Sequence, residues 1–188
     1  MPLSDSHRSS LLEVARHSVG IAATEKRRHQ PVPIPGLHEP RAVFVTLYMR
    51  ESLRGCIGSV VARYPLYRAV AEAAYSAAVE DPRFPPVQIE EVPELRIDIS
   101  VLSPFRDITP EQIVVGEHGL LVSRGRQRGL LLPQVAVEHR LSALRFLEET
   151  CRKAGLPPDA WKHGASIQAF TAEVFGEPAR TDTPSLAV

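Results

Sequence analysis

Apolar and polar residues alternate along several stretches of the chain with the period of two that a β-strand requires. The clearest is ELRIDISVLS, where the alternation predicts a strand whose buried side chains are Leu95, Ile97, Ile99 and Val101. AVFVTLY is rich in β-branched and aromatic residues, and LRGCIGSVV follows it after a short turn, so the two predict a hairpin. HGLLVSRGRQRGLLLP predicts a second hairpin, and ASIQAFTAEVF predicts a last strand.

Three other stretches follow the helical period. SLLE at residues 10–13 is a capping-box pattern and predicts the start of a helix. The alanine-rich LYRAVAEAAYSAAVE, preceded by a proline, predicts a second helix. LSALRFLEETCRKAG predicts a third, with Leu144, Leu147 and Cys151 on its apolar face.

Strand pairs with hairpin-length links are interleaved with these helices. The sequence therefore predicts an α+β fold, a mainly antiparallel β-sheet flanked by helices, and not a doubly wound parallel sheet. Residues 1–8 are expected to be a flexible N-terminus, residues 9–176 the folded domain, and residues 177–188 a loose tail without periodicity.

Composition narrows the class of protein. Lys+Arg and Asp+Glu are both 22, and this balance argues against a nucleic-acid-binding protein. No apolar run is long enough for a signal peptide or a membrane span, so a cytoplasmic protein is expected. The two cysteines form no CxxC pair and the seven histidines show no metal-binding spacing. No metal site is predicted, and the cofactor is left open.

LRGCIG places Cys56 between two glycines, and three interpretations are open. Cys56 is a nucleophilic or redox thiol, since a nearby cation favours the reactive thiolate and Arg54 shares its strand parity. Alternatively, the segment is an anion cradle in which Arg54 and the backbone at Gly55 and Gly58 hold a phosphate or carboxylate. In the third interpretation Cys56 is a small buried residue in a strand whose packing needs glycine.

Three further residues are candidates for chemistry. Asp81 and Arg83 follow a predicted helix in DPRFPP, either as an acid–base and anion-binding pair or as a loop ion pair. His118 in GEHGLL is a candidate base or a turn residue. Cys151 is interpreted as core. The basic hairpin tip around Arg126 is more typical of a solvated turn than of a phosphate contact.

Several segments together resemble the AMMECR-type domain family, whose members include proteins described as protein A of the AmmeMemoRadiSam system. They extend over roughly residues 10–176, and LRGCIG combined with RFPP and LLLPQVA is the most specific part. The matching segments are FVTL, LRGCIG, DPRFPP, EL…ISVLSP, GEHGLLV, GLLLPQVA and RKAGLPPDAW.

The resemblance implies an α+β fold with a larger and a smaller lobe around a cleft, and association with Memo-like and radical-SAM proteins. It implies no defined reaction. Two hypotheses follow. In the first, the chain is an enzyme or redox subunit that uses Cys56, with Asp81, Arg83 and His118 as cleft partners and Arg54 tuning the thiol. In the second, it is a non-catalytic module that docks a partner protein or a small anionic ligand.

Overall fold

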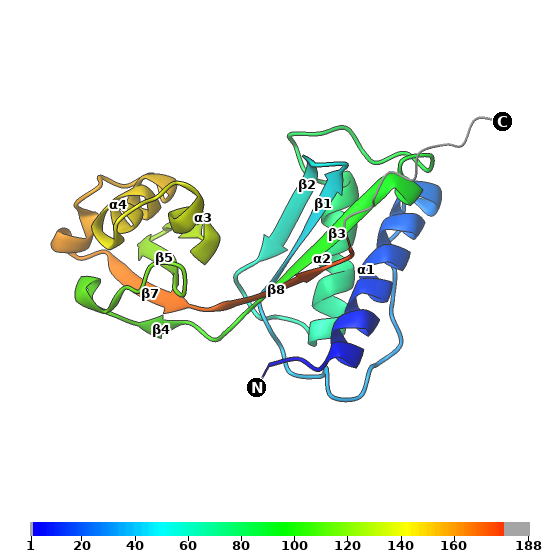
Figure 1. Cartoon of the computed structure of the whole chain (residues 1–188), viewed down its shortest axis with the longest axis horizontal. Helices are drawn as coiled ribbons and strands as arrows, with labels where there is room; N and C mark the ends of the chain where they lie inside the picture. The colour runs from blue at the N-terminus through cyan, green and yellow to red at the C-terminus, as the bar shows by residue number, and fades with distance from the viewer. Residues whose placement is uncertain (1, 179–188) are drawn as a thin grey trace. The chain divides into compact units, whose positions relative to one another are not determined.

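The computed structural model describes residues 2–178, and the chain divides into two compact units. Within the described residues, unit 1 comprises 2–101 and 174–178, and unit 2 comprises Leu102–Glu173. Unit 2 is therefore one continuous insertion in the sequence of unit 1. Both units combine helices with a β-sheet, which confirms the predicted α+β class (Figure 1).

A four-stranded sheet with the order β2-β1-β3-β8 forms the centre of unit 1, so β2 lies at one edge (Figure 1). β1 pairs antiparallel with both β2 and β3, and the predicted first hairpin is confirmed. The strands are β1 (Val43–Met49), β2 (Ser52–Ser59), β3 (Leu95–Leu102) and β8 (Ala172–Gly176).

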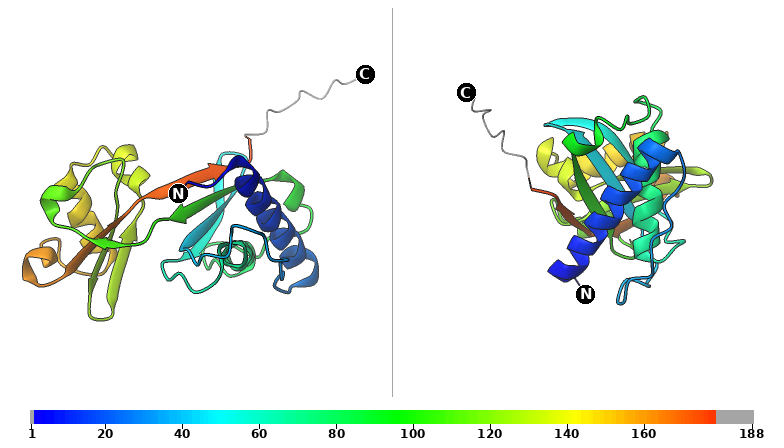
Figure 2. Two further views of the ribbon diagram at one scale, coloured as in Figure 1. Left: turned by 90° about the horizontal axis from the view of Figure 1, so that it is seen from below. Right: turned by 90° about the vertical axis from the view of Figure 1, so that its right-hand side faces the viewer.

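Two helices, α1 (Asp5–Glu25) and α2 (Leu66–Val79), run side by side and cover one face of this sheet (Figure 2). The predicted period of two explains why, because the alternate residues of β3, such as Ile97 and Ile99, are fully buried against the helices. A short 3-10 helix, η1 (Val92–Glu94), precedes β3.

The predicted start of the first helix is wrong. α1 begins at Asp5, because the Ser4 hydroxyl accepts a hydrogen bond from the His7 N–H at 3.2 Å and so caps the helix six residues before Ser10. SLLE lies inside the helix, where Leu11 is fully buried. Residues 5–8, expected to be flexible, form the first turns of α1.

Unit 2 has its own four-stranded sheet and its own core. The sheet has the order β4-β7-β5-β6, and the second predicted hairpin, β5 with β6, is confirmed. The strands are β4 (Arg106–Asp107), β5 (Gly119–Arg124), β6 (Gln127–Leu131) and β7 (Ser166–Phe170). The helices are α3 (Pro133–Glu138) and α4 (Ala143–Lys153), with the 3-10 helices η2 (Pro110–Gln112) and η3 (Ala160–His163).

Two predictions for the second half of the chain need correction. ASIQAFTAEVF is not one strand: Thr171 divides it into β7 of the unit 2 sheet and β8 of the unit 1 sheet. Leu144 is 50% exposed, because the face of α4 that enters the core is built around Phe146, Leu147 and Cys151.

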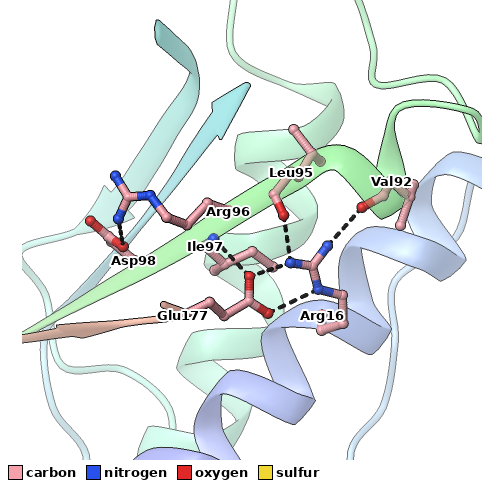
Figure 3. Close-up of polar contacts among 7 residues, drawn as sticks. All are labelled: Arg16, Val92, Leu95, Arg96, Ile97, Asp98 and Glu177. Atoms are coloured by element: carbon pink, nitrogen blue, oxygen red, sulfur yellow. Dashed lines mark hydrogen bonds and ion pairs between the residues drawn. The ribbon is translucent and has the colours of Figure 1, made fainter. Parts of the chain in front are cut away.

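The end of β8 is fastened to α1 by an ion pair (Figure 3). The Arg16 guanidinium donates to both carboxylate oxygens of Glu177 and, at 2.7 Å, to the carbonyls of Val92 and Leu95. Glu177 also accepts from the Ile97 N–H at 3.0 Å. The predicted loose tail thus begins with an anchored residue, and residues 179–188 lie outside the described chain.

Candidate functional site

The backbone of Cys56 is held from outside the sheet by the DPRFPP segment. In the β1–β2 pair, Cys56 lies opposite Thr46, and its N–H and C=O point away from β1. The Cys56 N–H donates to Asp81 Oδ2 at 2.9 Å, and Arg83 Nη2 donates to the Cys56 carbonyl at 3.3 Å. Two motifs 25 residues apart in sequence therefore meet at the open edge of β2.

Asp81 is an ionised, fully engaged acceptor. Its side chain is 2% exposed, and Arg83 binds it through Nε at 2.9 Å and Nη2 at 2.7 Å. These hydrogen bonds from Arg83 hold the pKa of Asp81 well below its ordinary value against the opposing effect of burial, and the Cys56 amide lowers it further. A carboxylate with so low a pKa is a weak base at neutral pH, so its geometry fits positioning better than proton transfer.

The Cys56 thiol is free, partly exposed and hydrogen-bonded within the sheet. The Thr46 hydroxyl donates to Cys56 Sγ at 3.2 Å. Thr46 is in turn paired in register with Asp98 of β3, so the three residues form a row across three strands. The parity of this row is opposite to that of the residues buried under α1 and α2, which places it on the other face of the sheet.

Sequence reasoning missed Thr46 and Asp98. Asp98 accepts from Arg96 Nη1 at 2.6 Å (Figure 3). The Arg96 guanidinium stacks over Tyr48, 4.4 Å from the ring centroid. The register of the predicted hairpin carries the signal for Thr46, because pairing AVFVTLY with LRGCIG places a hydroxyl directly opposite Cys56.

Arg54 is engaged away from the thiol. The register of the β1–β2 pair shifts between Leu47 and Tyr48, so that Arg54 is an extra residue in a β-bulge and its strand parity no longer fixes its direction. Its guanidinium binds both oxygens of Glu91 at 2.8 and 2.9 Å and the Pro85 carbonyl at 3.0 Å. The cation that contacts Cys56, through its carbonyl oxygen, is Arg83.

The two glycines allow close packing on opposite faces of the strand. A Cβ on Gly55 would lie 2.2 Å from the Ala77 carbonyl oxygen of α2. A Cβ on Gly58 would lie 2.5 Å from the Phe44 ring. The carboxylate that the LRGCIG backbone binds is the chain's own Asp81.

His118 belongs to unit 2 and is 3% exposed. Its Nδ1 accepts from the Val114 N–H at 3.1 Å, and its Nε2 lies 2.7 Å from Arg106 Nη2. His118 therefore closes the turn before β5 and is not brought together with Cys56 inside either unit. Cys151 is fully buried in the unit 2 core, and burial raises the pKa of its thiol.

Residues 2–178 hold no group of three or more His, Cys, Asp or Glu side chains that could bind a metal ion. No helix in the same range is long and apolar enough to cross a membrane.

The fold and the site define an α+β protein of two units with a free cysteine on an edge strand, whose backbone is held by Arg83 and the buried carboxylate of Asp81. A family model described as AMMECR1 matches residues 12–175, and the chain belongs to the AMMECR1 family. The family's members are proteins of uncharacterised activity.

Relatives match over nearly their whole length. Protein Mbar_A1807 of Methanosarcina barkeri is 39% identical over 93% of this chain and 92% of the relative. Protein PF1979 of Pyrococcus furiosus is 44% identical over 89% of this chain and 86% of its own. The crystal structure of uncharacterized protein PH0010 from Pyrococcus horikoshii, 42% identical, matches with a TM-score of 0.84 over 90% of each chain.

Proposed function

We propose that Cys56 is the functional thiol of this protein, and that its substrate or partner reaches it from the sheet face that carries Thr46 and Asp98. The observation that carries the proposal is the Thr46 hydroxyl hydrogen-bonded to a partly exposed, free Sγ. Such a hydrogen bond orients the sulfur atom, and a partly exposed free thiol is open to reagents from solvent.

In this proposal the neighbouring residues position the thiol. Asp81 and Arg83 hold the N–H and the C=O of Cys56, so the direction of its Cα–Cβ bond is set by an ion pair outside the strand, and the Thr46 hydroxyl contacts the sulfur itself. Arg54 holds the segment that follows DPRFPP through Glu91.

The proposal predicts selective alkylation of the folded protein by iodoacetamide. Cys56 is expected to be modified under native conditions, whereas the buried Cys151 reacts only after denaturation, and peptide mapping by mass spectrometry distinguishes them. Thr46→Val should slow modification of Cys56 by about two- to tenfold, the equivalent of one hydrogen bond. Labelling of Cys56 only in denaturant would show that the cysteine is structural, and the proposal would fall.

The alternative is a non-catalytic module that docks a partner. The contacts of Asp81 and Arg83 with the backbone of β2 support this alternative as well, because they hold the strand edge in place. Membership in the AMMECR1 family supports association with Memo-like and radical-SAM proteins, and two free cysteines fit the cytoplasm. Co-purification of the wild-type chain and of Cys56→Ser with these proteins separates the hypotheses. Binding that persists in Cys56→Ser while cellular function is lost favours the thiol. Retention of both favours the docking module.

A further inference from the structure

A cavity of about 560 Å³ opens in unit 1 between α2 and the end of β2. Its volume lies in the range of small-molecule sites. Small and apolar side chains line its inner part: Val43, Ile57, Ala69 and Ala73. LRGCIG contributes Ile57 and Gly58 to this lining, whereas Cys56 is not part of it.

The backbone of β2 presents polar groups to this cavity. The N–H and C=O of Cys56 point outward to Asp81 and Arg83, so the alternation along the strand also directs those of Gly58 outward. The segment 81–86 binds the strand edge at Cys56, and Gly58 itself lines the cavity. A ligand there meets an amide donor of an edge strand.

The charges at the cavity rim favour an anion. Arg63 is exposed, and among residues 2–178 its guanidinium has no ion-pair partner. The negative charge of Glu72 is offset by Arg28 at 2.8 Å. At Arg63 the rim thus offers a positive charge that no carboxylate of residues 2–178 neutralises.

We propose that this cavity binds a small organic anion, with its carboxylate or phosphate on Arg63 and the Gly58 N–H and its apolar body on the alanine face of α2. Guanidinium and backbone amide are the donors that carboxylate and phosphate groups accept from most strongly. This site is separate from the proposed thiol site, because Cys56 faces the opposite side of the sheet.

The test uses three probes of one shape: phenyl phosphate, benzoate and neutral benzamide, added to the full chain and followed by isothermal titration calorimetry. Phenyl phosphate or benzoate is expected to bind at least tenfold more tightly than benzamide, which lacks the charge. The tighter of the two anions assigns the head group as phosphate or carboxylate. Raising the salt concentration should weaken binding of the two anions and leave the affinity for benzamide unchanged.

Variants locate the binding. Arg63→Glu should weaken binding of the anion by at least about tenfold. Arg126→Glu, the same charge change at an exposed turn of unit 2, should leave the affinity unchanged. Ala69→Phe fills the cavity and should abolish binding of the anion. Cys56→Ser should leave it intact, which keeps this test independent of the thiol proposal. Melting temperatures of all variants confirm that they fold.

Three results would overturn the inference. They are equal affinity for benzoate and benzamide, anion binding that survives both Arg63→Glu and Ala69→Phe, and no heat with any probe at millimolar concentration.

Discussion

At the residue scale, the cysteine of LRGCIG is defined by contacts that lie far from it in the sequence. Its thiol meets Thr46, its N–H meets Asp81 and its carbonyl meets Arg83. Both candidates in DPRFPP were identified from the sequence, but their direct contact with Cys56 was not, because hydrogen bonds across a strand edge depend on register and on the path of a loop. Arg54 illustrates the same limit, since a single bulge turns it toward Glu91.

The hydrogen bonds that Asp81 accepts from Arg83 and the Cys56 N–H predict a specific pH dependence of stability. Because the pKa of Asp81 is lower in the folded chain than its ordinary 3.8, the stabilisation is complete above that value and is lost as the pH falls toward the folded-state pKa. Asp81→Asn cannot accept from both Arg83 and Cys56 in the same way. It should lower the free energy of unfolding at pH 7 by about 1–3 kcal/mol and flatten its decline in acid.

Urea unfolding followed by circular dichroism at pH 7, 4 and 3 measures this effect. Glu25→Gln, which removes a half-exposed surface carboxylate paired with Arg27, is the matched control and should change stability by less than about 1 kcal/mol. An acid decline in Asp81→Asn as steep as that of the wild type would contradict the assignment.

At the element scale, the glycines of β2 determine how closely α2 approaches the sheet. Gly55→Ala places a Cβ 2.2 Å from a helix carbonyl and should destabilise the protein by about 1–3 kcal/mol, because α2 must move. Gly20→Ala is the control: nothing lies within 4 Å of its Cβ and it sits inside α1, so it should stabilise by about 0.5–1 kcal/mol. Thermal melting of both variants tests the pair, and opposite signs are required.

Periodicity was a good guide to elements and a poor guide to their ends. The alternation in β3 and the spacing in α2 predicted both elements, because each turns one apolar face toward the same core. The start of α1 depends on which serine caps it: the capping-box pattern points to Ser10, whereas the structure uses Ser4. The division of ASIQAFTAEVF at Thr171 depends on two separate sheets, which no local pattern reveals.

At the scale of the whole molecule, the chain leaves unit 1 after β3 and returns as β8, and Arg16 fastens the returning strand. Glu177→Gln should therefore lower the free energy of unfolding of unit 1 by about 1–3 kcal/mol and leave that of unit 2 unchanged. Hydrogen exchange read by mass spectrometry should show that the amides of β3 and β8 exchange faster in the variant than in the wild type. The amides of β5 and β7 should exchange at the wild-type rate.

The control for this change is Glu149→Gln, which removes a surface ion pair with Arg152 on α4. It should alter the exchange of neither sheet measurably. Equal acceleration in both units after Glu177→Gln would mean that the ion pair stabilises the chain globally and not unit 1 alone.

The return of the chain also bears on how the protein is made. Ribosomes synthesise β3 before unit 2 and β8 after it, so the first sheet gains its last strand late. Ser103 and Thr171, 68 residues apart, are joined by hydrogen bonds of 2.9 Å from the Ser103 N–H to the Thr171 carbonyl and from the Thr171 N–H to Ser103 Oγ. Once unit 2 has folded, its ends are already held together, and closure of that long loop, on the order of 4 kcal/mol in chain entropy, no longer opposes the docking of β8. A folded unit 2 thus lowers the entropic cost of adding β8 to the sheet of unit 1.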